Sequence, residues 1–170
     1  QLVGRVPRTE TSVAVRVIGG SPDGRHLLIG TEGSGLADYD ITSGNVTLHQ
    51  SLAIDSSSLS GNTVRAAIEG NNGVVWIGTA TGLDRYDRAS KVLTHFGEAD
   101  GLPSGYIAGL ALDASGMLWI STDRGIVRFD VADKRVKRYT TADGLQGNEY
   151  NGHAYFASRA RGSQIGAWAS

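Results

Sequence analysis

The stretch Trp76-Ile77-Gly78-Thr79 decides the fold, because closely related segments stand before and after it in the chain. These segments are Leu28-Ile29-Gly30-Thr31 and Trp119-Ile120-Ser121-Thr122. Each is followed by a glycine and an apolar residue, and then by an aromatic residue and an aspartate. The step from Ile29 to Ile77 is 48 residues, and the step from Ile77 to Ile120 is 43 residues. Self-similarity at such a period predicts one supersecondary unit per copy, each of which buries a face against the next.

The second and third copies align at an offset of 43 residues, and each contains four short runs with the pattern of strands, separated by turn residues. The runs are 64–68, 74–78, 83–86 and 92–96 in the second copy, and 107–112, 117–121, 126–129 and 135–139 in the third. Four short strands per period of roughly 40 to 50 residues are typical of a β-propeller blade. The sequence therefore predicts an all-β fold, a partial ring of about three to four blades that are four-stranded antiparallel sheets.

We expect one propeller segment over residues 1–170, with blades at about 12–50, 62–97 and 106–140. The first copy begins with a strand predicted at 13–17. A partial blade at 148–170 follows the third copy, and residues 2–6 stand where a closing strand would lie. Because three blades fall below the usual four to eight, either a composite fourth blade closes the ring or two chains pair their open edges. We favour self-association as a homodimer.

Composition excludes several classes of function. The chain has 16 basic and 17 acidic residues, so no broad field for nucleic acid is expected. It has no cysteine, which rules out disulfides and thiolate metal sites. No apolar run approaches the roughly 18 residues of a membrane span. The chain begins at Gln1 without a recognisable targeting signal, and we expect a fragment of a longer protein.

The motif Trp76-Ile77-Gly78-Thr79, with the following Gly82-Leu83-Asp84-Arg85-Tyr86-Asp87 and Gly101-Leu102-Pro103-Ser104, resembles the two-component regulator propeller repeat. The segment from Gly144 to Asn151 is similar to one that opens a late blade in that family. This repeat makes up the sensor region of bacterial hybrid histidine kinases. The resemblance implies a periplasmic location, a glycan or other small polar ligand, and contact with the membrane only through parts that this chain lacks.

Residues with catalytic or metal-binding potential do not form a recognisable cluster in the sequence. The four histidines occupy unrelated repeat positions, and His49 aligns with Phe96 and Tyr139, which predicts a packing role. The recurrent Asp40, Asp87 and Asp130 are expected to cap tight turns by accepting backbone N–H bonds. Trp76 and Trp119 are interpreted as packing between blades. We therefore predict no catalytic residue, no metal and no cofactor.

Position within a blade supplies the remaining candidates for ligand binding. Arg16 and Arg65 lie at related places on the first strand, which is the innermost strand of a blade. The hairpins and connections at the channel mouth add further polar residues. The candidate ligand-binding set is Arg16, Glu32, Arg65, Thr81, Tyr106, Asp123, Arg124, Asn148 and Glu149.

Three hypotheses for function follow. The first is a non-catalytic ligand-sensing fragment of a two-component receptor, which rests on the resemblance because fold alone does not fix function. The second is a propeller enzyme of the lyase type, which would need histidines or acids with a metal at the channel mouth. The third is a scaffold propeller that binds only protein partners, for which an exposed aromatic patch on one rim would be expected.

Overall fold

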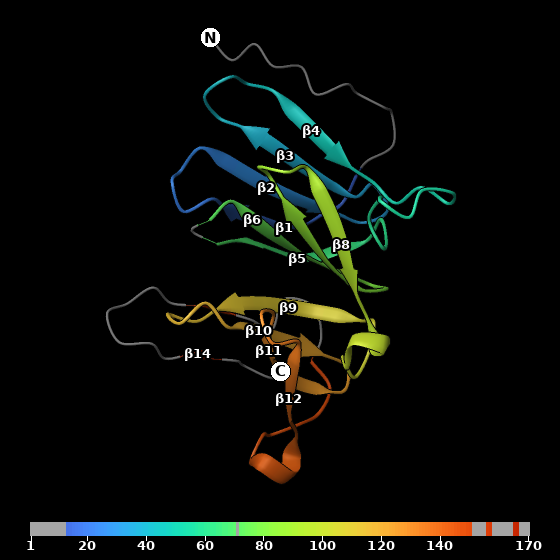
Figure 1. Cartoon of the computed structure of the whole chain (residues 1–170), viewed down its shortest axis with the longest axis vertical. Helices are drawn as coiled ribbons and strands as arrows, with labels where there is room; N and C mark the ends of the chain where they lie inside the picture. Colours follow the sequence, from blue (N-terminus) through green and yellow to red (C-terminus); the bar gives the residue numbers. More distant parts are fainter. Residues whose placement is uncertain (1–12, 71, 151–155, 158–164, 167–170) are drawn as a thin grey trace.

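A computed structural model describes residues 13–70, 72–150, 156–157 and 165–166. Three four-stranded antiparallel sheets follow one another along the chain, and each has its strands in sequential order. Figure 1 shows the sheets one above another, with the amino-terminal sheet at the top and the third at the bottom. We call them blades 1, 2 and 3. The predicted all-β propeller architecture is confirmed.

The blades have closely similar strands. Blade 1 contains β1 (Val15–Gly20), β2 (His26–Thr31), β3 (Leu36–Asp40) and β4 (Val46–His49). Blade 2 contains β5 (Val64–Glu69), β6 (Val74–Thr79), β7 (Leu83–Asp87) and β8 (Val92–Phe96). Blade 3 contains β9 (Ile107–Leu112), β10 (Leu118–Thr122), β11 (Gly125–Asp130) and β12 (Arg135–Tyr139). Two short strands, β13 (Phe156–Ala157) and β14 (Ile165–Gly166), pair antiparallel beyond blade 3. The predicted closing strand at 2–6 lies outside the described residues.

The first strand of blade 1 exists, but its predicted limits of 13–17 were wrong, since β1 begins at Val15 and extends to Gly20. Val13 is 41% exposed, whereas Gly19 and Gly20 pair with Leu28 and Leu27 of β2. Gly19 belongs in the strand because blade 2 approaches closely there, and a Cβ at this position would lie 2.9 Å from the carbonyl oxygen of Ala67.

Turn chemistry repeats from blade to blade. The Oδ1 atom of Asp40 accepts backbone N–H bonds from Thr42 and Ser43, at 2.8 and 3.1 Å. The equivalent atoms of Asp87 and Asp130 accept bonds from the residues two and three positions later. The capping role predicted for these aspartates is confirmed. Short 3₁₀ turns at Glu98–Asp100 and Thr141–Asp143 start the connections that lead away from blades 2 and 3.

Two apolar clusters hold the blades together. The cluster between blades 1 and 2 contains Val17, Leu28, Leu36, Val64 and Ile77 among its buried members. The cluster between blades 2 and 3 includes three aromatic side chains, Trp76, Phe96 and Phe129, and the ring centroids of the two phenylalanines are 5.3 Å apart. Burial of aromatic and branched aliphatic surface is the main driving force for stacking one sheet on the next.

The two tryptophans of the repeat do not share one environment. Trp76 is 5% exposed within the cluster between blades 2 and 3, as predicted for a packing residue. Trp119 is only half-buried; it stacks on Tyr139 at 5.5 Å and its Nε1 donates to Asp113 at 3.0 Å. Packing between blades was also predicted for Trp119, and the described residues do not place it between two four-stranded sheets. Trp119 lies on the face of blade 3 that points away from blade 2. The equivalent face of blade 2 packs against blade 3, whereas the described residues place no fourth four-stranded sheet against this face of blade 3.

Candidate functional site

An extra residue interrupts the first strand of every blade. In blade 1, Val15 and Val17 pair with the consecutive residues Thr31 and Gly30, so that Arg16 is left out of the ladder. The same irregularity leaves out Arg65 in blade 2 and Ala108 in blade 3. Such β-bulges bend a strand and redirect a side chain, and they are common beside binding sites. Two of the three arginines in the candidate ligand-binding set, Arg16 and Arg65, are therefore bulge residues.

The bulge of blade 1 places Arg16 against Glu32, which begins the hairpin after β2. The Arg16 Nη2 atom lies 2.5 Å from the Glu32 Oε2 atom. Both side chains reach solvent, with 30% and 48% of their surfaces exposed. The sequence named Arg16 and Glu32 only as members of one candidate ligand-binding set, and the structure shows that they are in direct contact.

The bulge of blade 2 places the Arg65 guanidinium over the ring of Tyr106, with its carbon 4.4 Å from the ring centroid. Tyr106 belongs to the connection that leads into β9 of the next blade. The Nε atom of Arg65 is buried without a hydrogen-bond partner in the described part of the chain. No carboxylate of the described residues lies within ion-pairing distance of Arg65. Its positive charge therefore interacts only with solvent and with the Tyr106 ring among the described groups. Cation–π contacts of this kind orient the guanidinium without neutralising it.

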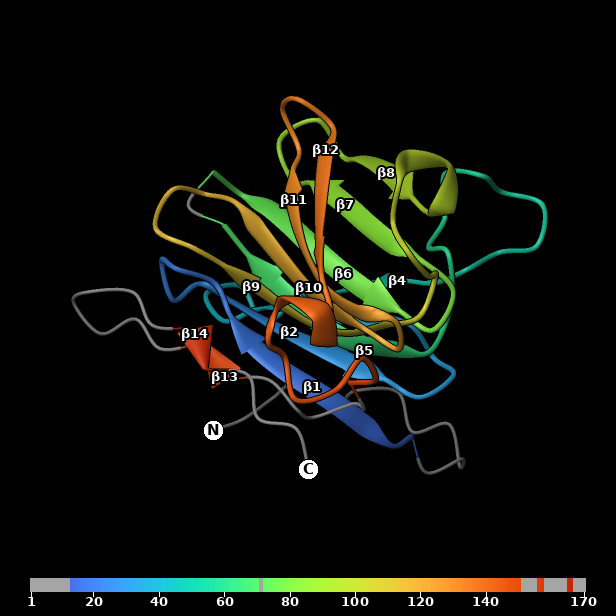
Figure 2. The same cartoon turned by 90° about the horizontal axis from the view of Figure 1, so that it is seen from below.

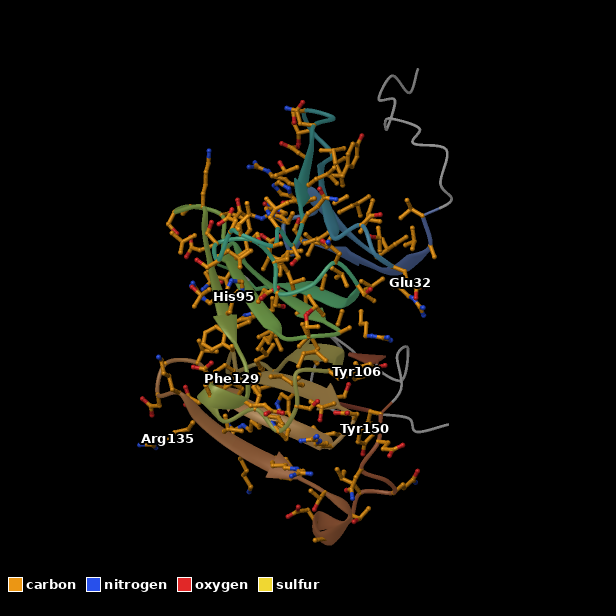
Figure 3. All side chains as sticks on the ribbon, turned by 90° about the vertical axis from the view of Figure 1, so that its right-hand side faces the viewer. Glu32, His95, Tyr106, Phe129, Arg135 and Tyr150 are labelled. Atoms are coloured by element: carbon orange, nitrogen blue, oxygen red, sulfur yellow. The ribbon has the colours of Figure 1, made fainter. Side chains whose placement is uncertain are left out.

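These contacts lie on one edge of the molecule. Figure 3 shows Glu32, Tyr106 and Tyr150 along this edge, whereas His95 and Arg135 lie on the opposite edge. Figure 2 shows the same two sides from another direction, with β1 on one side and β8 and β12 on the other. The edge with Glu32 and Tyr106 is thus that of the first strands, which is the inner edge of a propeller blade.

The other predicted site residues have different surroundings. Thr81 donates its Oγ1 hydrogen to the Ser60 carbonyl at 2.7 Å and so joins the hairpin to the preceding connection. Arg124 donates to the Pro103 carbonyl at 3.0 Å and lies 3.8 Å from Glu98. The Asn148 side chain accepts from the Thr141 backbone at 2.8 Å. Asp123 and Glu149 are exposed. The described contacts connect none of these residues to either bulge arginine.

Sequence reasoning missed a polar group on the opposite edge, which we call the His95 clamp (Ser60, Asp84, His95 and the Ser56 carbonyl). His95 Nδ1 lies 2.7 Å from Asp84 Oδ1, and His95 Nε2 lies 2.7 Å from the Ser56 carbonyl oxygen. Ser60 donates its hydroxyl and its backbone N–H to Asp84 Oδ2, both at 3.0 Å. Both imidazole nitrogens thus meet acceptors, which favours the charged ring.

The clamp contains the residue types of a serine hydrolase but lacks their arrangement. The serine hydroxyl bonds to the carboxylate rather than to the imidazole, and the second imidazole nitrogen is occupied by a backbone carbonyl. A nucleophile needs a base within hydrogen-bond reach. Burial raises the pKa of Asp84. Burial opposes the charge of His95, but hydrogen bonds to Asp84 and to the Ser56 carbonyl outweigh it and raise the pKa of His95.

A second unpredicted group, the Arg88 cluster (His26, Asp38, Glu69 and Arg88), joins blades 1 and 2. Arg88 donates to both carboxylate oxygens of Glu69, at 3.0 and 2.9 Å, and also to Asp38. His26 Nδ1 lies 2.9 Å from the same aspartate. Asp38 and Glu69 are 5% and 6% exposed. A cleft of about 350 Å³ beside the cluster is lined by His26, Asp38, Asp40, Ser43, Asn45, Thr47, Tyr86 and Arg88.

Neither polar group resembles a metal centre. Among the described residues, no set of three or more histidine, aspartate or glutamate side chains has the arrangement needed to hold a metal ion. No helix of the described chain is long and apolar enough to cross a membrane.

Comparison with known families supports the predicted resemblance. The sequence profile of the family described as "Two component regulator propeller" matches residues 58–81 and 101–124. Each match covers a connection between blades and the first two strands of the blade that follows, β5 and β6 or β9 and β10. The chain therefore carries repeats of the two-component regulator propeller family. A search among curated proteins finds no significant match.

Solved structures with the same fold include extracellular domains from B. thetaiotaomicron. One is assigned to the hybrid two-component system BT3049; it matches with a TM-score of 0.69 and 21% identity over 85% of this chain and 20% of the other. Two structures of BT4673, one described as a one-component and one as a hybrid two-component system, match with TM-scores of 0.64 and 0.63. They share 21% and 19% identity over 78% and 76% of this chain. The chain spans about a fifth of the length of these structures, since the matches cover 19% to 20% of them.

Proposed function

We propose that this chain is a non-catalytic, ligand-sensing part of the periplasmic propeller of a bacterial two-component receptor. The repeat match and the extracellular domains with the same fold support this location and this class of protein. The observation that carries the sensing role is the pair of bulge arginines, Arg16 and Arg65, on the first strands of adjacent blades. The bulge recurs at one repeat position in all three blades, and in two of them it directs a cationic side chain to the inner edge, where propellers bind ligands.

The absence of a catalytic arrangement in the described residues supports a binding role. In the His95 clamp, the serine hydroxyl bonds to the carboxylate and the imidazole has no free nitrogen, so no base is available to activate the hydroxyl. A propeller lyase would also need several acids or histidines gathered at the inner edge, whereas the described contacts there involve one acid, Glu32, which is paired with Arg16.

Sensing would follow from a ligand that contacts two blades at once. Tyr106 comes from the connection into blade 3, while Arg65 comes from blade 2. A ligand bound across this junction stabilises one arrangement of neighbouring blades over another. A receptor responds to such differential affinity by a shift in the population of its signalling states.

Thermal-shift screening of the soluble chain tests this proposal. A panel of neutral and acidic mono- and oligosaccharides, with one metal-supplemented condition, should contain a compound that raises the melting temperature without being consumed. At 100 times its Kd, a ligand adds about 2.7 kcal/mol to the free energy of unfolding. Conversion of any panel compound, dependent on the supplied metal, would contradict the non-catalytic assignment and favour a lyase.

We also propose that a second copy of the chain covers the outer face of blade 1. Ile18, Ile29, Ala37 and Leu48 form one cross-strand row on this face, and Ile18 and Leu48 are 67% and 61% exposed. The equivalent row of blade 2 contains Ala67 and Ile77, which pack against blade 1. Exposed apolar rows at a sheet surface are typical of interaction sites. Light scattering that gives the 17.9 kDa mass of one chain at micromolar concentration would exclude this self-association.

A further inference from the structure

We infer that the two bulge arginines form a recognition site for an oxyanion, a carboxylate or a sulfate ester carried by the ligand. This inference rests on the proposed sensing function and names the chemical class of what is sensed. It is carried by the orientation of Arg65, by the lack of a carboxylate beside it in the described residues, and by the repetition of the same device at Arg16 one blade earlier.

Arg65 is held in place before any ligand arrives. Its neighbours Val64 and Ala66 are both fully buried, which fixes the backbone on each side of the bulge. The Tyr106 ring supports the guanidinium plane at 4.4 Å, and the Nε atom is enclosed. The terminal Nη groups are left as the available donors. A cation ordered in this way loses little side-chain entropy when it binds, so more of each contact appears as affinity.

The charge of Arg65 sets it apart from most arginines of the described chain. Arg16, Arg25, Arg85, Arg88, Arg124 and Arg135 each lie within 4.0 Å of a carboxylate. Arg65 has no such partner in the described residues, although it is half-buried between two blades. A half-buried cation without a counter-ion favours the approach of an anion, because the reduced dielectric strengthens their attraction.

Arg16 supplies a second, exchangeable arm. Its ion pair with Glu32 is open to water on both sides. Exposed ion pairs of this kind contribute little to stability, so an anionic ligand can displace the glutamate at small cost. Arg16 and Arg65 are bulge residues at the same repeat position of adjacent first strands. Their contact partners, Glu32 and Tyr106, lie on the same edge in Figure 3.

The chemistry of the guanidinium group narrows the chemical class of the ligand. Its donors form a rigid planar fork that matches the paired oxygens of carboxylates and sulfates, whereas a neutral hydroxyl engages one donor at a time. The partner side chains at the edge, Glu32 and Tyr106, offer acceptors and a ring face for the neutral part of the same ligand. An acidic saccharide or a small sulfated or carboxylated solute satisfies both requirements.

Isothermal titration with three probes tests the inference: D-glucuronate, D-glucose as the neutral analogue, and inorganic sulfate. We expect glucuronate to bind at least tenfold more tightly than glucose, and the preference to decline as salt is added. Binding of sulfate with the same salt dependence would identify the oxyanion alone as the recognised group. Binding of glucuronate without sulfate would show that the sugar ring is also required. Both results support an oxyanion site.

Variants of Arg65 test whether the preference for glucuronate depends on this bulge arginine. Arg65→Gln should weaken glucuronate binding about tenfold or more, and Arg65→Lys should be intermediate because it keeps the charge but loses the fork. Arg135→Gln is the matched control, since Arg135 lies on the opposite edge and is 81% exposed. The melting temperature of each free variant verifies its fold, and Arg65→Lys decides the test if Arg65→Gln unfolds.

The outcomes distinguish the two proposals. Equal affinity for glucose and glucuronate, unchanged in Arg65→Gln, would overturn the oxyanion site and leave a sensor of neutral glycans. Glucuronate binding that is lost equally in Arg65→Gln and Arg135→Gln would overturn the assignment to the inner edge. If neither these probes nor any saccharide of the wider panel binds the wild-type chain, the sensing function itself fails.

Discussion

The two interfaces between consecutive blades are built from different chemistry, although the blades repeat one pattern of strands. Between blades 2 and 3 the contact is apolar and aromatic, with Trp76, Phe96 and Phe129 at its centre. Between blades 1 and 2 smaller aliphatic side chains form the apolar cluster, and buried charges of the Arg88 cluster supplement it. The repeat therefore determines where the blades meet but not what joins them.

The difference is visible in single cross-strand rows. The row Ala67, Ile77, Asp84 and His95 of blade 2 faces blade 1 and ends in two polar residues. The equivalent row of blade 3, Leu110, Ile120, Val127 and Arg138, is apolar over its first three positions. Residues without counterparts in the other repeats thus give each interface its specificity, while the repeated residues supply the framework.

The largest expected effect is at the aromatic interface. Trp76→Ala should lower the free energy of unfolding by about 3–5 kcal/mol, as is usual when a large buried aromatic is truncated. Trp76 is 5% exposed, and its ring lies 5.8 Å from that of Phe96. Urea denaturation followed by tryptophan fluorescence and circular dichroism measures the change.

Trp119→Ala is the matched control, because Trp119 has the same repeat position on the half-buried face of blade 3. Its loss should cost clearly less than that of Trp76, since fewer contacts are removed. An equal loss of stability in both variants would break the comparison, and would indicate that another sheet covers blade 3 in solution.

The next largest effect is expected at the charged interface. Arg88→Met should cost about 2–3 kcal/mol, below the roughly 3–5 kcal/mol of a fully buried pair, because Arg88 is partly exposed. The variant leaves the carboxylates of Asp38 and Glu69 buried without their shared cation. Chemical denaturation with urea measures the change.

Arg25→Met provides the control, because Arg25 is 73% exposed and lies 3.9 Å from an exposed aspartate. Removal of an exposed partner of this kind should change stability by less than about 1 kcal/mol. If Arg88→Met were equally neutral, the charges would not hold blades 1 and 2 together, and the apolar cluster alone would suffice.

Most of the framework was predictable from the sequence because it depends on local residues that recur. The strands of blades 2 and 3, their turns and the capping role of Asp40, Asp87 and Asp130 followed from the repeat. The limits of β1 did not, because Gly19 is required there by a neighbouring blade rather than by its own turn.

The candidate site was predictable only in part. The inner position of Arg16 and Arg65 followed from the repeat alignment, but the bulges that direct them appear only in the strand registers. The contact between Arg88 and Asp38 joins residues 50 positions apart in different blades, and no local sequence pattern predicts it. The pair Asp84 and His95 could have been found from the sequence. Both residues are polar and face each other across two strands, at positions where blade 1 has the apolar residues Ala37 and Leu48.

The smallest expected effect concerns the His95 clamp, and it depends on pH. The folded state raises the pKa of His95, which is about 6.5 when unperturbed, because the charged ring donates to Asp84 and to the Ser56 carbonyl. A group whose pKa is raised on folding stabilises the native state below its unfolded pKa, and this contribution is lost as the pH rises through the folded value. His95→Gln should therefore cost about 1 kcal/mol at pH 6, the usual net contribution of a hydrogen bond.

At pH 9 the neutral ring of the wild-type protein can donate only one of the two bonds, so the difference between wild type and His95→Gln should become small. Burial lowers the pKa of His49 and gives the opposite dependence, with stability lost as the pH falls, but that contribution is common to both proteins and cancels in the difference. Melting temperatures of the two proteins from pH 5.5 to 9 measure it. A difference that stays constant over this range would show that folding does not shift the pKa of His95. The clamp would then fix the Ser56 segment without any contribution from the charge of the ring, and only the Arg88 cluster would distinguish the first interface electrostatically from the second.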